Sequence, residues 1–224
     1  MSMVKIVSIT QPLIDDEDGE KLTIEEFIAY CARVSNPSNQ MNTKTASKLL
    51  QYCADNKHWS IFEMANVTME VVTTRDIAHQ IIRHRSYAFQ EFSQRYADPT
   101  KELKFTIREA RLQDSKNRQN SIEINDEHLQ QEWEIKQRQV IMAANEAYQW
   151  AIDMGLAKEV ARSVLPEGLT ETKLYMNGTV RSWIHFIQVR TDPSTQKEHR
   201  EIALLCADEL TKIIPMIHGF VSKQ

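Results

Sequence analysis

Glycine is scarce in this chain, and its scarcity excludes the common phosphate-binding loops. The five glycines are Gly19, Gly155, Gly168, Gly178 and Gly219. No two of them have the spacing of G-x-G-x-x-G or of G-x-x-x-x-G-K-[ST], so the chain has neither the dinucleotide-binding turn of a Rossmann fold nor a P-loop. A phosphate ligand would therefore have to be held by arginine side chains and helix N-termini.

Cysteine and long apolar runs are also scarce. The cysteines Cys31, Cys53 and Cys206 form no C-x-x-C pair, and each lies among apolar residues at helical spacing. This pattern favours core packing over a catalytic thiol. No stretch approaches the roughly 20 apolar residues of a membrane span, and the first residues lack the pattern of a signal peptide. We therefore expect a cytoplasmic protein that does not enter a membrane.

The overall charge gives no sign of a polyanion-binding protein. The net charge is −4 and the isoelectric point is near 6.0, which argues against a protein that coats nucleic acid. Any anionic ligand must then be met by a local cluster of cations. The histidines and carboxylates lack the spacings of zinc and EF-hand sites, so we expect no metal.

Hydrophobic periodicity predicts one α+β domain over residues 1–224, with a central sheet flanked by helices and a long helix in the second half. The expected strands are 3–10, 65–73 and 169–176, and the expected helices are 24–34, 44–57, 74–85, 126–154, 159–164, 180–190 and one that starts near 195. Capping boxes are expected at 23–26 and 195–198. Asn177–Gly178 predicts a turn, and the polar stretch 111–121 predicts an exposed loop.

One short segment concentrates cationic and aromatic side chains. Residues 83–96 read RHRSYAFQEFSQRY, and the predicted helix 74–85 would place Gln80, Arg83 and His84 on one face. A charge run of this kind is usually a solvated surface. Arginine side chains also suit phosphate and carboxylate oxygens, and the aromatic rings suit either a core or a stacked ligand. Composition alone leaves both interpretations open.

The predicted helix 180–190 carries a second polar group. Arg181, His185 and Gln188 form a narrow stripe beside a broad apolar face. Arg190 lies outside that stripe, near the helix end. It either leaves the core there or is buried with an anionic partner, and burial with such a partner would be functional.

Several motifs together resemble the flavin-dependent thymidylate synthases. They are CARVS near residue 33, HWSIFE at 58–63, the Arg-His-Arg-x7-Ser signature within 83–96, EVARSVLP at 159–166 and RSWIHFIQVR at 181–190. The resemblance covers most of the chain, with the motifs in the family's order.

The resemblance implies a fold, a reaction and an assembly. The family is a homotetramer with a mixed α/β core and with its sites at subunit interfaces. It makes dTMP from dUMP, with 5,10-methylenetetrahydrofolate as carbon donor, bound FAD as redox carrier and NADPH as reductant. No cysteine lies in the Arg-His-Arg-x7-Ser signature, which agrees with a reaction that uses no cysteine nucleophile.

The resemblance also implies roles for individual residues. FAD would be bound by Ser35, His58, Ser60, Arg83, His84, Arg85, Glu91, Thr179, Arg181 and His185. dUMP would be bound by Gln80, Arg83, Glu91, Phe92, Ser93, Gln94, Arg95, Arg162 and Arg190. Among these, Arg95 and Arg162 would hold the phosphate, and Arg190 would be catalytic, favouring the N3-ionised uracil. Gln90 and Thr179 stand where the family frequently has asparagine, which affects flavin contact more than activity.

Other interpretations of the same residues make different predictions. A nucleic-acid-binding module would show salt-dependent polynucleotide binding and no flavin. A flavoprotein for another substrate would carry FAD without binding dUMP. In a scaffold protein with solvated arginines, replacement of Arg83 would leave ligand binding unchanged. Ser93 as a nucleophile is disfavoured, because no histidine–carboxylate pair is legible around it.

Overall fold

The computed structural model describes residues 2–222. Its strands are β1 (Met3–Ile9), β2 (Asn66–Thr74), β3 (Ala88–Glu91), β4 (Arg111–Gln113), β5 (Ser121–Glu123) and β6 (Glu171–Thr179). Its α-helices are α1 (Ile24–Ala32), α2 (Ala46–Asp55), α3 (Arg75–Ile81), α4 (Pro99–Glu102), α5 (Glu127–Asp153), α6 (Lys158–Ala161), α7 (Val180–Arg190) and α8 (Lys197–Thr211). Short 3-10 turns are η1 (Pro37–Asn39), η2 (Thr43–Thr45), η3 (Trp59–Glu63), η4 (Arg162–Val164) and η5 (Pro215–Phe220).

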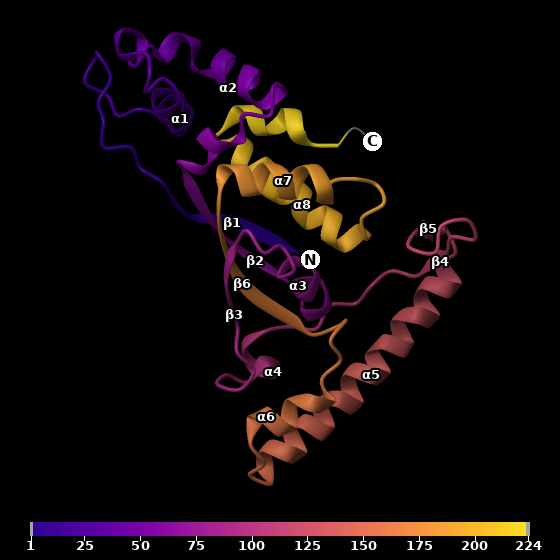
Figure 1. Ribbon diagram of the computed structural model, residues 1–224. Helices are drawn as coiled ribbons and strands as arrows, with labels where there is room; N and C mark the ends of the chain where they lie inside the picture. The colour runs from indigo at the N-terminus through magenta and orange to yellow at the C-terminus, as the bar shows by residue number, and fades with distance from the viewer. Residues whose placement is uncertain (1, 223–224) are drawn as a thin grey trace.

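A four-stranded antiparallel sheet forms the centre of the fold. Its order is β1-β2-β6-β3, and the helices α7 and α8 lie on the same side of it (Figure 1). The register pairs Val67 with Gly178, Met69 with Met176 and Val71 with Leu174, and all of these residues are buried. This alternation turns one apolar face of the sheet toward the helices. The predicted α+β class, with a central sheet and a long helix in the second half, is confirmed.

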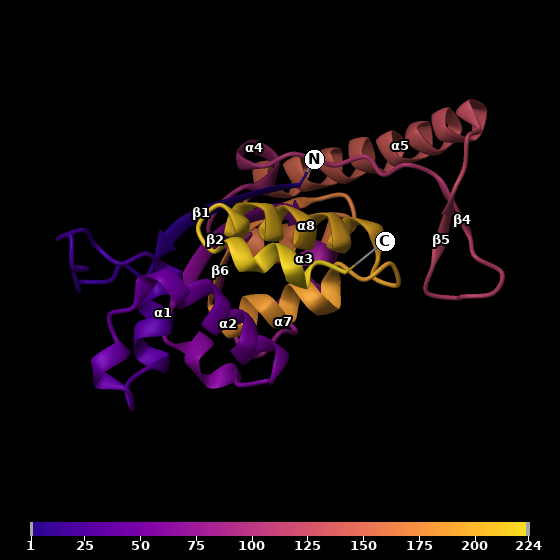
Figure 2. The same cartoon turned by 90° about the horizontal axis from the view of Figure 1, so that it is seen from above.

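The long helix α5 lies apart from the main core. Figures 1 and 2 show it extending from α6 toward the β4–β5 hairpin. A small cluster of Tyr148, Ala151, Ala161 and Leu165 packs its C-terminal part against α6. The long helix predicted over 126–154 is confirmed. Trp133 and Val140, on its N-terminal half and at its middle, are 44% and 49% exposed, because little of the chain covers them. Among residues 2–222, no helix is long and apolar enough to cross a membrane.

Hydrogen bonds confirm the predicted capping box at 23–26 and show a second cap at the start of α7. The capping box at Thr23 is present, with the Glu26 N–H donating to Thr23 Oγ1 and the Thr23 N–H donating to the Glu26 carboxylate. Thr179 caps α7 by accepting from the Ser182 N–H at 3.2 Å. These caps fix where α1 and α7 begin, because each satisfies backbone N–H groups that the helix leaves free.

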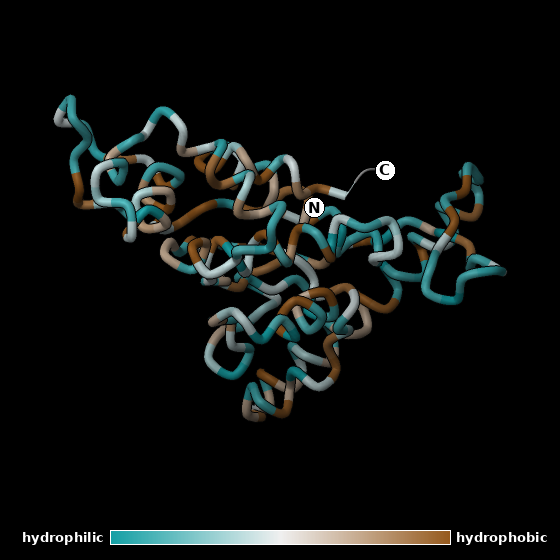
Figure 3. Tube along the Cα trace, turned by 45° about the horizontal axis from the view of Figure 1, so that its top comes forward, coloured by the Kyte–Doolittle hydropathy of each residue, from teal (hydrophilic) through white to brown (hydrophobic). Residues whose placement is uncertain are grey.

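Two local predictions were wrong, and a third was incomplete. Asn177 and Gly178 lie inside β6, paired with Thr68 and Val67, and form no turn. The capping box at 195–198 does not form, because α8 starts after Gln196 and the Thr195 hydroxyl donates to the Val189 carbonyl. The Glu198 carboxylate accepts from Arg111 and Gln196 instead. The segment 111–121 is not only a loop. Its ends pair as β4 and β5, while the connection between them is strongly hydrophilic (Figure 3).

Candidate active site

The signature segment leaves its helix earlier than expected. Helix α3 ends at Ile81, and the His84 N–H closes a turn on the Ile81 carbonyl at 3.0 Å. The prediction that Gln80, Arg83 and His84 share one helical face was therefore wrong. Arg83 and Arg85 are exposed, whereas His84 is half-buried. The segment therefore places Arg83 and Arg85 at the surface and turns the His84 imidazole inward.

Aromatic packing anchors this segment to α7. The Tyr87 ring lies 5.0 Å from the Trp183 ring in an edge-on arrangement and also meets Phe186 and Phe89. The Trp183 Nε1–H donates to the Val67 carbonyl at 3.1 Å, which fixes α7 on the sheet. Tyr87 Oη is buried with no partner among the described residues. Tyr87 and Phe89 are therefore structural, and Tyr87 packs beside the His84 ring, whereas Tyr96 of the same segment is 83% exposed.

The polar stripe on α7 lines a cavity of about 500 Å³. Arg181, His185 and Gln188 contribute to it, as the sequence suggested. The remaining lining residues come from the helix itself, the signature turn and η3: Ser182, Ile184, Ser86, Trp59 and Glu63. Arg181 forms an ion pair with Glu63, a partner that the sequence analysis had not singled out. The cavity therefore combines an indole surface with a guanidinium and an imidazole.

Other predicted flavin-binding residues lie outside this cavity in the single chain. Ser35 is exposed just after α1, and Ser60 is exposed within η3. His58 is exposed at the start of η3, and its ring meets Tyr52 edge-on at 6.2 Å. Arg83 and Arg85 do not line the cavity either. One chain therefore brings together only part of the predicted flavin set.

Arg190 and His84 meet although 106 residues separate them in the sequence. The Arg190 Nε–H donates to His84 Nε2 at 2.9 Å, so this imidazole nitrogen carries no proton. Arg190 is half-buried, and no carboxylate of residues 2–222 lies within ion-pair distance of it. We expected Arg190 either to be exposed or to be buried with an anion. Neither expectation holds, because Arg190 is half-buried and its partner is a neutral histidine.

Burial and positive charge keep two histidines neutral here. Burial, followed by the charge of Arg190, lowers the pKa of His84 to about 4. The same causes lower the pKa of His199, which is fully buried, to about 3. Burial and the neighbouring Arg83 lower the pKa of Arg190 from its usual value. The site therefore holds neutral imidazoles beside the Arg190 guanidinium.

We expect the free energy of unfolding to fall as the pH drops from about 6.5 toward 4. The unfolded chain binds protons on these histidines below 6.5, whereas the folded chain does not until about 4 or 3. The stabilisation that comes from these two histidines is therefore fully present above pH 6.5 and is lost as the pH falls through about 4 and 3. Replacing His199 with glutamine should reduce the difference between urea unfolding at neutral and at acidic pH. An unchanged difference would contradict a neutral buried His199.

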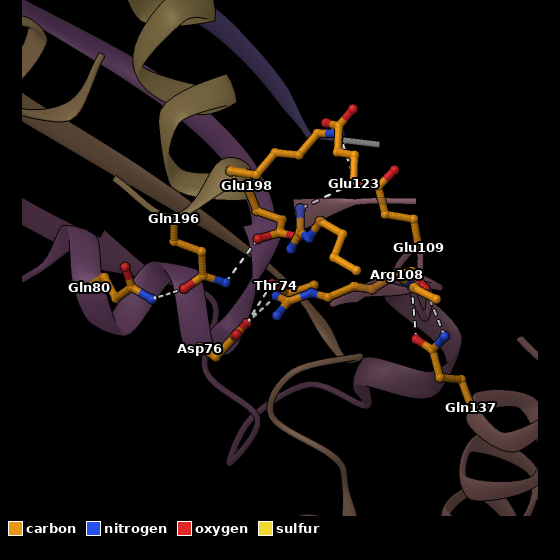
Figure 4. Close-up of polar contacts among 12 residues, drawn as sticks. Thr74, Asp76, Gln80, Arg108, Glu109, Glu123, Gln137, Gln196 and Glu198 are labelled. Atoms are coloured by element: carbon orange, nitrogen blue, oxygen red, sulfur yellow. Dashed lines mark hydrogen bonds and ion pairs between the residues drawn. The ribbon is translucent and has the colours of Figure 1, made fainter. Parts of the chain in front are cut away.

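Gln80 contacts α8 rather than the signature arginines. Its amide Nε2 donates to Gln196 Oε1 at 2.7 Å (Figure 4), and its Oε1 lies 3.3 Å from His199 Nδ1. The sequence did not point to Gln196 or His199 as site residues, because neither stands in one of the family motifs. The only signal in the sequence was that both residues are polar and lie at the start of the predicted helix near 195.

The end of β3 and the loop after it form a second polar group. Glu91 accepts from Arg75 Nη1 at 3.2 Å and from the Thr172 hydroxyl at 2.8 Å. Ser93 Oγ accepts from the Arg95 N–H at 3.4 Å, a contact within its own loop. Gln94 is buried, and its Nε2 has no partner among the described residues. Ser93 therefore orders the loop, while the Gln94 Nε2 lies buried without an acceptor among the described residues.

Arg95 and Arg162 lie near α6, away from Arg190. Arg95 pairs with Glu159 of α6 at 3.2 Å, and Arg162 follows α6 directly. Figures 1 and 2 place α4 and α6 at one end of the sheet and α7 at the other. A single chain therefore separates the two predicted phosphate-binding arginines from Arg190 and from the cavity beside α7.

Comparisons with known proteins agree along nearly the whole chain. The family model described as "Thymidylate synthase complementing protein" matches residues 19–216. The chain is 50% identical over 214 residues to a flavin-dependent thymidylate synthase of Synechocystis sp., covering 96% of each. It is 48% identical over 213 residues to a probable flavin-dependent thymidylate synthase of Paramecium bursaria Chlorella virus 1, covering 95% of each.

A solved structure shares the fold. It is the UMP/dUMP methylase PolB from Streptomyces cacaoi bound with 5-Br dUMP, with a TM-score of 0.78 and 24% identity. The match covers 98% of this chain and 94% of that chain.

Proposed function

This chain belongs to the thymidylate synthase complementing protein family, and we propose that it makes dTMP from dUMP with a bound flavin. The finer proposal is reductive methylation, with the methylene group from 5,10-methylenetetrahydrofolate and with FAD reduced by NADPH. The observation that carries it is the near-complete alignment, at about half identity, with two proteins named as flavin-dependent thymidylate synthases.

The cavity beside α7 suits a flavin. Trp59 offers an aromatic face, while Arg181 and His185 offer cationic and hydrogen-bonding groups for a ring or a pyrophosphate. We assign FAD binding to Arg181, His185 and Thr179 in this region, together with Ser35, His58, Ser60, Arg83, His84, Arg85 and Glu91. A bound flavin would supply the reducing equivalents of the reaction.

We propose that the complete site needs a second copy of the chain. Arg95 and Arg162 would hold the dUMP phosphate, yet they lie beside α6, which Figure 1 shows at the far end of the sheet from α7. Exposed apolar residues on α5 support assembly: Trp150 is 61% and Met142 is 71% exposed. A homotetramer with sites at subunit interfaces would bring phosphate-binding and uracil-binding groups together.

Arg190 has the geometry of a charge-stabilising group. Its Nε–H is held by His84, and we propose that the terminal guanidinium nitrogens contact the substrate. There they would stabilise negative charge that develops on the uracil oxygen and N3. Gln80, Phe92, Ser93 and Gln94 would complete the nucleotide contacts.

The cysteines do not fit a nucleophilic role. Burial raises the pKa of the Cys31, Cys53 and Cys206 thiols, which disfavours the reactive thiolate. Ser93 hydrogen-bonds within its loop and has no histidine partner among the described residues. Both observations support a reaction that uses no covalent protein nucleophile.

The visible spectrum of the purified protein tests the proposal first. We expect flavin bands that NADPH bleaches, and dTMP formation when dUMP and methylenetetrahydrofolate are added, with UMP as the substrate control. A colourless folded protein that does not take up FAD or bind dUMP would refute the proposed function. Flavin bands without dUMP binding would instead indicate a flavoprotein for another substrate.

Replacing Arg181 with alanine should weaken FAD binding about tenfold or more, the scale of a lost hydrogen bond from a charged group. Titration of the flavin-free protein with FAD, followed by flavin fluorescence, measures the dissociation constant. Lys212→Ala is the control, because it also removes an exposed cation paired with a carboxylate, Glu209, on a different helix. Equal affinities for wild type and Arg181→Ala would remove Arg181 from the flavin site.

A further inference from the structure

A chain of hydrogen bonds links the β4–β5 hairpin to Gln80. Arg111 Nη2 donates to Glu198 Oε1 at 2.5 Å, and Gln196 Nε2 donates to Glu198 Oε2 at 2.9 Å. Gln80 Nε2 donates to Gln196 Oε1 at 2.7 Å, and Gln80 Oε1 lies 3.3 Å from His199 Nδ1. Figure 4 shows the part from Gln80 through Gln196 to Glu198. We call these five residues the Glu198 relay.

The charged end of the relay is well shielded. The side chains of Arg111 and Glu198 are 12% and 19% exposed. Burial alone would raise the pKa of Glu198, but the Gln196 hydrogen bond and the charges of Arg111 and Arg108 lower it. Glu198 is therefore an ionised carboxylate, which can only accept hydrogen bonds.

The Glu198 carboxylate determines the direction of each further hydrogen bond in the relay, from Gln196 through Gln80 to His199. Gln196 must turn its NH₂ toward Glu198, so its carbonyl oxygen faces Gln80. Gln80 must then present its own NH₂ to Gln196, and its carbonyl oxygen to His199. That oxygen requires a proton on His199 Nδ1, so the Nε2 of the neutral ring carries a lone pair. His199 Nε2 is indeed buried without a donor among the described residues.

We infer that Glu198 is a positioning residue that sets the amide orientation of Gln80 and the tautomer of His199. Gln80 keeps one amide hydrogen and one lone pair in a defined direction, while His199 presents no second N–H toward the Arg190 region. The inference deepens the proposed function, on which it rests in assigning Gln80 to dUMP. It adds Glu198, Gln196 and His199 to the groups that shape the nucleotide site.

The distinguishing variant is Glu198→Gln, which keeps the shape of the side chain but can donate as well as accept. Gln196 can then adopt either amide orientation, and the preference is no longer passed on to Gln80 and His199. We expect a mixture of His199 tautomers. We also expect the KM for dUMP to rise about tenfold, as when one oriented hydrogen bond is lost. FAD affinity and kcat should change much less.

Solid-state ¹⁵N NMR of histidine-labelled protein in its flavin-bound form reads the tautomer directly, with the His199 signals identified by their loss in His199→Gln. The control is Glu123→Gln. It removes an ion pair between Lys197 and the same hairpin at 2.5 Å but leaves the relay intact. Wild type and control should show only the Nδ1-protonated, neutral ring.

Two results would overturn the inference. One is a wild-type His199 that is protonated on Nε2. The other is a Glu198→Gln variant with the wild-type tautomer and an unchanged KM for dUMP. The tautomer measurement does not depend on turnover, so an enzyme that makes no dTMP would refute the proposed function while the NMR result still decides the relay.

Discussion

Replacing Arg190 with alanine should lower kcat for dTMP formation by about 10²–10³-fold, the usual effect of removing one preorganised charge-stabilising donor. The protein should still fold and keep its flavin, because Arg190 lies at the C-terminal end of α7 and is not among the residues to which we assign FAD binding. The main loss should therefore appear in kcat rather than in FAD affinity.

The physical reason lies in the surroundings of Arg190. Its contact is the neutral His84, and no carboxylate of the described chain competes for its charge. A guanidinium already directed by one hydrogen bond needs little reorganisation as charge develops on a ligand. Lysine at this position would keep the charge but lose the forked geometry, so we expect Arg190→Lys to restore only part of the rate.

Single-turnover measurement of dTMP formation at saturating dUMP checks this expectation. Arg200→Ala is the matched control, because it removes an arginine of α8 that donates to the Pro193 carbonyl at 2.9 Å. This variant should leave the rate nearly unchanged. A loss smaller than about tenfold in Arg190→Ala would argue against transition-state stabilisation by this group.

Replacing Gly178 with alanine should destabilise the protein by about 1–3 kcal/mol, the range for overpacking a tight core. A Cβ at this position would lie 2.4 Å from Cδ1 and Cε1 of Tyr87 and 3.3 Å from Ser182 Cβ. Tyr87 is packed against Trp183 and Phe186 and cannot withdraw freely. Its displacement would also shift the signature turn and loosen the contact between His84 and Arg190.

Urea unfolding of the flavin-free protein measures the effect of Gly178→Ala. Gly219→Ala is the control, since an added Cβ there meets nothing within 4 Å, and it should be neutral or slightly stabilising. In a Tyr87→Ala background the methyl group at Gly178 should cost little, because its obstacle is gone. Equal losses in both backgrounds would mean that the cost comes from β6 itself.

Helices with strong end signals were predictable from the sequence. The extent of α7, Val180–Arg190, was predicted in full, because Thr179 caps its start and Asp192–Pro193 follows its end. The strands β1 and β2 were also placed to within a residue or two. These elements were predictable because caps, breakers and alternating apolar residues act over a few neighbouring positions.

Contacts between distant segments were not predictable in this way. Gly178 has the sequence context of a turn, but it serves as the space into which Tyr87 packs, 91 positions earlier in the chain. Glu198 matches a capping box, but Arg111 and Gln196 engage its carboxylate instead. In each case the local signal was genuine, and a partner remote in sequence offered the more favourable contact.

The sequence by itself determined much of the secondary structure around the sheet, the lack of glycine-rich phosphate loops, and the resemblance that led to the family. Only the tertiary structure decided which of those residues meet. It directs Gln80 to α8, pairs Arg190 with a neutral histidine and separates Arg95 and Arg162 from both. The reason is physical: spacing along a chain fixes which side chains share a helix or strand, whereas burial and hydrogen bonding between packed elements select their partners.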